Sequence, residues 1–157
     1  MSIKKALVVG LATAIPILGF SKLQTFFFGE YELEPEDSLM FSVDDLPDEI
    51  GGYEVLSEYF PDGIEVVWTG KKFKAPKAGR VKYSKKDEDF IATKDENPCG
   101  FKISVNKKKG KVSGSFKVYV AKSEKKLKSY TAKISGYLGS PLSVTIKKVG
   151  TYEGALD

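Results

Sequence analysis

The side chains in this chain that could do chemistry are clustered carboxylates, one cysteine and a dense run of lysines. Histidine is absent, which removes the usual general base near neutral pH, the usual partner of a nucleophilic serine or cysteine, and a common transition-metal ligand. The single cysteine, Cys99, excludes an intramolecular disulfide and a thiolate zinc cluster. We therefore predict no catalytic residue, no metal site and no cofactor, and expect that the chain is not an enzyme.

The carboxylates are densest at Asp44-Asp45 with Asp48-Glu49. A glycoside hydrolase needs two carboxyl groups that converge across a cleft at roughly 5 to 10 Å, and neighbours in sequence do not provide that geometry by themselves. Calcium loops need oxygen ligands at fixed offsets around a glycine, which neither this cluster nor residues 87–89 match. We favour solvated acidic loops, and a carboxylate-dependent hydrolase is only the third functional hypothesis.

Three aromatic side chains, Trp68, Tyr59 and Phe73, are candidate ligand contacts. Aromatic faces suit the apolar side of a sugar ring, so together they could form a stacking platform for a carbohydrate-binding domain. However, Trp68 shares one face of an expected strand with Ile64 and Val66, which favours a place in the core.

The densest basic cluster is Lys107-Lys108-Lys109-Gly110-Lys111. These lysines are candidate contacts to an anionic surface, but the cluster lies where one expected strand ends and another begins. A solvated hairpin tip, whose lysines discourage edge-to-edge aggregation, is the favoured interpretation. Aromatic residues do not interleave with the lysines as in known nucleic-acid modules, so we expect no nucleic-acid partner.

The strands expected to hold these side chains are predicted most clearly between residues 101 and 149. Four successive runs place an apolar side chain at every second position, which gives a strand one buried face. Glycine and lysine clusters separate them at a spacing typical of antiparallel hairpins. The runs are Phe101-Ile103-Val105, Phe116-Val118-Val120, Tyr130-Ala132-Ile134 and Leu142-Val144-Ile146.

Earlier in the chain, a turn at residues 61–63 precedes a strand at 64–68, and shorter strands are expected near residues 53–55, 73, 81–83 and 90–91. The total of eight or nine short strands predicts an all-β fold, either an antiparallel β-sandwich that is Ig-like in appearance or a small barrel. Residues 30–50 stay unassigned, because 35–38 could begin a short helix and 39–41 could form a strand.

Charge divides the chain into two parts. Residues 30–70 hold thirteen acidic side chains and no basic one, whereas residues 71–157 hold 22 basic against 8 acidic side chains. If the two parts fold together, their opposite charges cancel much of the electrostatic field of the protein. If they fold apart, the basic part attracts anionic polymers. We divide the chain into a leader at 1–25, an acidic lead segment at 26–52 and a β domain at 53–157.

The leader has the composition of an export signal. Lys4 and Lys5 precede an uncharged, mostly apolar stretch at residues 6–20, which is too short to span a bilayer comfortably. We expect a signal peptide and export to the periplasm, cell surface or medium. An uncleaved membrane anchor and a buried N-terminal helix are the alternatives.

Short blocks of sequence also follow one another in an order that resembles a known module. They are PDGI at 61–64, WTGKKF at 68–73, APKAGRV at 75–81, NPCGFKI at 97–103, GSFKVY at 114–119, LKSYTA at 127–132 and IKKVG at 146–150. Over about residues 60–152 the chain resembles an unnamed β-rich module near the C-termini of large secreted or surface proteins of verrucomicrobia-like bacteria. This resemblance implies a secreted or surface-attached β module with no catalytic residues to transfer.

These observations favour a non-catalytic, exported interaction module of the cell envelope or the extracellular space. Its expected partner is a protein or a cell-envelope polymer, with contact through edge strands by strand addition. A membrane partner is expected only if the leader is not removed.

Overall fold

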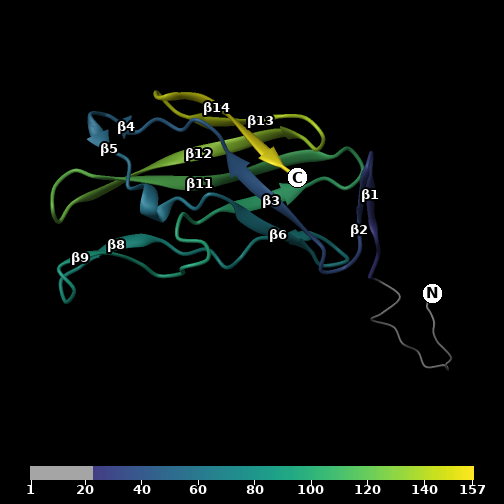
Figure 1. Ribbon diagram of the computed structural model, residues 1–157, viewed down its shortest axis with the longest axis horizontal. Coiled ribbons are helices and arrows are strands. Elements are labelled where there is room, and N and C mark those ends of the chain that lie inside the picture. Colours follow the sequence, from purple (N-terminus) through teal and green to yellow (C-terminus); the bar gives the residue numbers. More distant parts are fainter. Residues whose placement is uncertain (1–22) are drawn as a thin grey trace.

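The chain folds into antiparallel β-structure with no α-helix among the residues described. The computed structural model describes residues 23–157, so the predicted leader at 1–25 lies almost wholly outside the described residues (Figure 1). The predicted fold class is confirmed: one large sheet is nearly closed into a barrel-like sandwich.

The large sheet has eight strands in the order β10-β11-β12-β13-β14-β3-β6-β7, and every neighbouring pair is antiparallel. The strands are β3 (Ser38–Val43), β6 (Ile64–Trp68), β7 (Phe73–Lys74), β10 (Lys102–Val105), β11 (Lys111–Ala121), β12 (Leu127–Tyr137), β13 (Leu142–Ile146) and β14 (Gly150–Leu156).

The four alternating runs become β10 to β13, as their pattern predicts. Phe116, Ile134 and Ile146 are 1%, 3% and 1% exposed, while the lysines, serines and threonines between the apolar positions of β12 and β13 face solvent. Apolar side chains on one face of each strand are removed from water together, which is the main favourable term in folding.

Three small hairpins accompany the large sheet. β1 (Phe26–Phe28) pairs with β2 (Tyr31–Leu33), β4 (Glu49–Ile50) with β5 (Tyr53–Glu54), and β8 (Val81–Ser84) with β9 (Asp89–Ala92). A 3-10 turn, η2 (Ser57–Tyr59), follows β5. The β1–β2 hairpin lies at one end of the sheet in Figure 1, where the Phe26 ring packs 5.3 Å from Trp68 and 5.0 Å from Phe73.

The structure corrects the expected domain boundary between residues 52 and 53. β3, from the supposed lead segment, lies between β14 and β6 in the large sheet, and its Leu39 and Phe41 are buried. The β domain therefore includes at least residues 26–157. Sequence reasoning left residues 39–41 unassigned because Met40, between these two, is apolar although it is 47% exposed.

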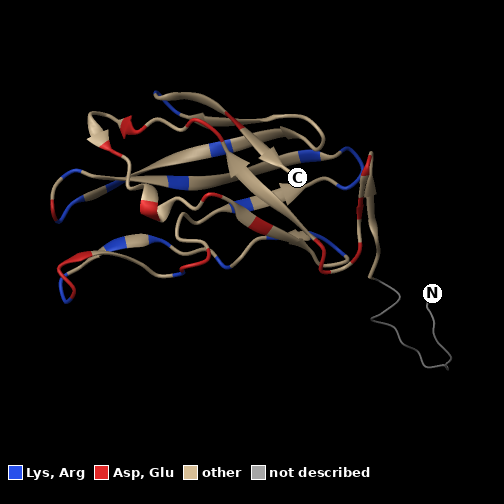
Figure 2. Ribbon diagram, viewed as in Figure 1, with Lys and Arg blue, Asp and Glu red and all other residues tan. Residues whose placement is uncertain are grey.

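The acidic and basic parts of the chain consequently fold together. Figure 2 marks lysine positions along β11 and β12 of the basic part, and acidic positions on β6 and at the β1–β2 hairpin of the acidic part. Both parts contribute strands to one sheet.

Candidate functional site

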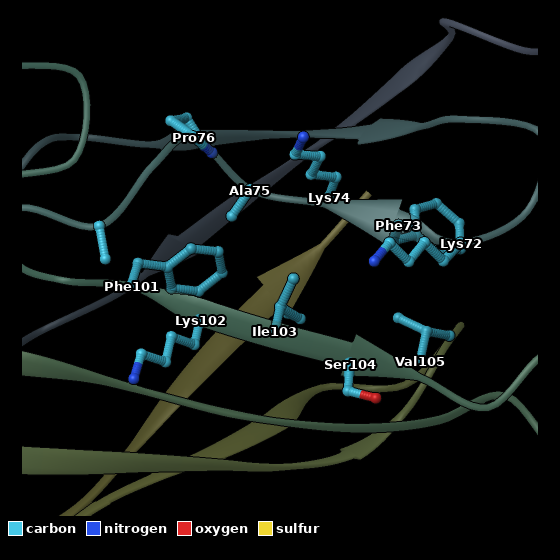
Figure 3. A pocket seen from close by; sticks show the side chains of 11 residues that line it. Lys72, Phe73, Lys74, Ala75, Pro76, Phe101, Lys102, Ile103, Ser104 and Val105 are labelled. Atoms are coloured by element: carbon cyan, nitrogen blue, oxygen red, sulfur yellow. The ribbon is translucent and has the colours of Figure 1, made fainter.

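The candidate site is the line along which the sheet fails to close. β7 and β10 are the two edges of the eight-stranded sheet, and they lie against each other without forming a ladder. A groove of about 330 Å³ runs between them (Figure 3). We call this line, from Lys72–Ala75 on one side to Lys102–Val105 on the other, the seam.

The backbone of β10 turns peptide groups toward the seam. Asn106 N–H donates to the Lys111 carbonyl at 2.8 Å, in register with the pairing of Val105 with Val112. Because hydrogen-bonded and non-bonded pairs alternate along an antiparallel ladder, Lys102 and Ser104 bond to β11. The N–H and C=O groups of Ile103 and Val105 therefore point to the free edge.

β7 does the same from the opposite side. Thr69 N–H donates to the Lys72 carbonyl at 3.0 Å, in register with the pairs Val67–Lys74 and Trp68–Phe73. By the same alternation, the Phe73 N–H and C=O point away from β6 and toward the seam.

Side chains divide the seam into an apolar floor and a basic rim. Phe73 is buried, and Ala75, Ile103 and Val105 are partly buried against the core. Figure 3 shows Ala75 and Ile103 directed into the space between the strands, whereas the Lys74 and Lys102 side chains lead away from it. The exposed residues of the rim are Lys72, Lys74, Lys102 and Ser104.

One end of the seam is held by Asn97. Its Nδ2 donates to the carbonyls of Pro76 at 2.9 Å and Phe101 at 3.0 Å, and its Oδ1 accepts from Phe101 N–H at 2.7 Å. Pro76 follows β7 and Phe101 precedes β10, so this one amide joins the two edges. Asn97 is 0% exposed, the only buried polar side chain among residues 23–157.

The other end is held by Lys107, one of the predicted anionic contacts. Its ammonium donates to the Lys71 carbonyl at 3.0 Å and lies 5.8 Å from the Trp68 ring centroid. Lys108 and Lys109 form the exposed tip, where their N–H groups bond to Asn106 Oδ1. The hairpin-tip interpretation is confirmed, and contact of Lys108, Lys109 and the exposed Lys111 with an anionic surface stays a prediction.

The aromatic platform does not form on the surface. Trp68 is 1% exposed and Phe73 is 6% exposed, because both rings pack with Phe26 at the end of the core. Tyr59 is half-buried, and its hydroxyl donates to the Phe90 carbonyl at 2.7 Å. Stacking on a sugar face through Trp68 and Phe73 is thus ruled out in this fold, although Phe73 still lines the seam.

The other reactive groups lie apart from one another. The carboxylates at 44–45 and 48–49 are exposed, and within residues 23–157 no cluster of three His, Cys, Asp or Glu side chains could hold a metal ion. Cys99 is fully buried beside Asn97, with Sγ 3.7 Å from Oδ1. Burial raises the pKa of its thiol from 9.0 to about 11, so the reactive thiolate is scarce near neutral pH.

Asn97 is the structurally decisive residue that sequence reasoning missed. The Asp95-Glu96-Asn97-Pro98 stretch predicts a turn, and asparagine is common in turns for local reasons. The one available signal was an asparagine close to the apolar Phe101 run, which does not reveal a bond to Pro76, 21 residues away.

Comparisons with known proteins identify no relative: no family model, curated protein or solved structure matches the chain. No helix in the part of the chain that the structure describes is long and apolar enough to cross a membrane.

Proposed function

We propose that this protein is a non-catalytic interaction module that binds an extended segment of another protein along the seam, by strand addition. The observation that carries the proposal is that two sheet edges face each other with the peptide groups of Phe73, Ile103 and Val105 directed into a groove. Strand addition uses such free backbone groups for affinity and the adjacent side-chain pockets for specificity.

The spacing of the edges supports this use. Strands in a ladder are about 4.8 Å apart, so two edges that both pair with one inserted strand are about 10 Å apart. Some Cα atoms of β7 and β10 already lie within 8 Å of each other. An inserted segment therefore requires the edges to separate by a few ångströms, and would then complete the closure of the sheet.

The test is hydrogen exchange of the protein with and without synthetic hexapeptides in which Val alternates with Ser, Glu or Lys. Slower exchange of the Ile103 and Val105 amides with at least one peptide is the expected result. The control is the same peptide with N-methyl groups on alternate residues, which cannot donate to an edge. If no peptide slows exchange at the seam, or if the N-methylated control does so equally, the proposal is wrong.

We also propose that the module acts outside the cytoplasm. The composition of residues 1–22 and the resemblance of residues 60–152 to a secreted module support export. Gln24 adds a constraint on processing: its carbonyl accepts the Trp68 Nε1–H at 2.7 Å and its N–H donates to Gly70. We expect mass spectrometry of the protein from fractionated cells to find a mature N-terminus that precedes Gln24. Intact Met1 in the cytoplasmic fraction would contradict export.

A further inference from the structure

We infer that the segment bound in the seam belongs to a partner protein and alternates apolar residues with Asp or Glu. This inference rests on the proposed function and names the chemistry of its ligand. It follows from the two sides that the seam presents to any strand placed between β7 and β10.

The inner side selects apolar residues. Successive side chains of a strand point to opposite faces, so every second residue of the added segment faces the floor. That floor consists of Phe73, Ala75, Ile103 and Val105, which are buried or half-buried against the core. A polar side chain directed there would lose water without gaining a hydrogen-bond partner.

The outer side selects acidic residues. Lys74 lies on β7 and Lys102 on β10, with Lys72 preceding β7, and all three are exposed. Directly opposed side chains on neighbouring strands have Cβ atoms about 5 Å apart, within reach of a lysine–carboxylate pair. Two acidic groups, Glu65 and Glu96, do not line the seam but line a different hollow, together with Lys74.

Lysines on an edge also protect a sheet from aggregation, and that role must be weighed against binding. The two roles agree here, because a seam pressed against the seam of a second copy would oppose lysine to lysine. The chain does contain a five-residue acidic–apolar alternation, at Glu30–Glu34. Its central residues are already engaged in β2, which pairs with β1 and whose Tyr31 hydroxyl donates to the Leu156 carbonyl. These contacts favour a partner protein over a second copy as the source of the segment.

The length of the segment is also limited. About four residues of each edge face the seam, between the Asn97 contact at one end and the Lys107 contact at the other. The matched ligand therefore has four to six extended residues, and its flanking chain leaves outward over the ends.

The experiment measures binding of the full chain to three fluorescent hexapeptides, in which Val alternates with Glu, Ser or Lys. We expect the Glu peptide to bind at least about tenfold more tightly than the Ser peptide, and the Lys peptide to bind most weakly. The preference for Glu should weaken with added salt, because exposed charges are screened.

Two triple variants locate the effect. Lys72→Gln with Lys74→Gln and Lys102→Gln should reduce affinity for the Glu peptide to that for the Ser peptide. The matched control, Lys85→Gln with Lys86→Gln and Lys148→Gln, removes the same charge from exposed turns and should keep most of the preference.

The outcomes separate the two levels of the proposal. If the Ser peptide protects the seam amides and binds as tightly as the Glu peptide, the acidic preference is overturned while strand addition stands. If no peptide protects the seam, both are overturned. If sedimentation shows that the chain self-associates and that the Glu peptide dissociates it, the occupant is a second copy and the assignment to a partner protein is overturned.

Discussion

The β11–β12 pair and the β7–β10 seam are two contacts between neighbouring strands of the same molecule, and they are held by different forces. β11 and β12 pair over eleven residues each, with hydrogen bonds along the whole ladder. β7 and β10 meet through apolar side chains and are joined by Asn97 and Lys107 at the ends.

Local chemistry accounts for the difference. β7 is only two residues long, and Pro76 follows shortly after it without an N–H to donate to a neighbouring strand. Both edges also carry exposed lysines, Lys74 on β7 and Lys102 on β10, and lysines on an edge strand discourage direct pairing with another edge. The comparison shows that a sheet can bury its core and still leave backbone N–H and C=O groups on one pair of edges without a ladder partner.

Hydrogen exchange should give the largest contrast between these two regions. In the ladder, Phe116 and Ala132 form a bonded pair in the buried centre, whereas the Ile103 and Val105 amides lack a ladder partner. Central amides open only with global unfolding, which costs about 5–15 kcal/mol in typical domains. We expect exchange at the seam to be at least about 1,000-fold faster, as measured by NMR. Equal protection would mean that the seam is closed.

Removal of the Asn97 amide should have the next largest effect. Asn97→Ala leaves two carbonyls and one N–H without their partner, and each buried group that stays unpaired costs about 1–3 kcal/mol. We expect a loss of about 3 kcal/mol in the free energy of unfolding, measured with urea. Asn106→Ala is the control, because Asn106 bonds to exposed turn amides that water can satisfy; its effect should be clearly smaller, and an equal loss would contradict a special role for Asn97.

At the same end of the seam, burial of Cys99 should make the stability of the protein depend on pH. Its pKa is raised from 9.0 to about 11 in the folded state, so the neutral thiol is the form that folding favours. This contribution is complete below pH 9 and is lost as the pH rises toward 11. The measurement is the difference in unfolding free energy between the protein and Cys99→Ala, in which the titration of the lysines cancels because both proteins share it. This difference should fall by about 2 kcal/mol over that interval. A pH-independent difference between the two proteins would refute the raised pKa.

The smallest effect is expected at the other end of the seam. Lys107→Met removes an exposed hydrogen bond to Lys71 and a distant cation–π contact with Trp68, and such exposed contacts contribute less than about 1 kcal/mol. Lys108→Met, at the exposed tip, provides the comparison and should leave stability unchanged. A loss at Lys107 as large as that at Asn97 would show that the two ends hold the seam equally.

Sequence patterns predicted much of the fold because the relevant physics is local. Period-two alternation in β10 to β13 and in β6 identified the strands and their buried faces, including the place of Trp68 in the core. The hairpin tip at Lys107–Lys109 was likewise correct, since lysines and a glycine between two strands leave few alternatives.

The candidate site was less accessible from sequence. Edge strands were expected to make the contact, but nothing in the chain indicated which strands would be the edges. A strand at residues 39–41 was left as one of two alternatives because exposed Met40 obscures the alternation of β3. Without β3, nothing connects β14 to β6 and β7 in the order of the sheet. Asn97 was read as a turn residue because its bond to Pro76 joins separate segments.

The amino-acid pattern was sufficient to predict an all-β fold and the buried faces of β6 and of β10 to β13. Residue content alone also argued against chemistry that depends on histidine or on two cysteines of this chain. These conclusions depend on residue type and on spacing along one strand. The folded structure alone shows that β7 and β10 meet unpaired and that an apolar floor lies between lysine rims. That arrangement depends on the order and curvature of eight strands, because closure of a sheet joins residues that are remote in the chain.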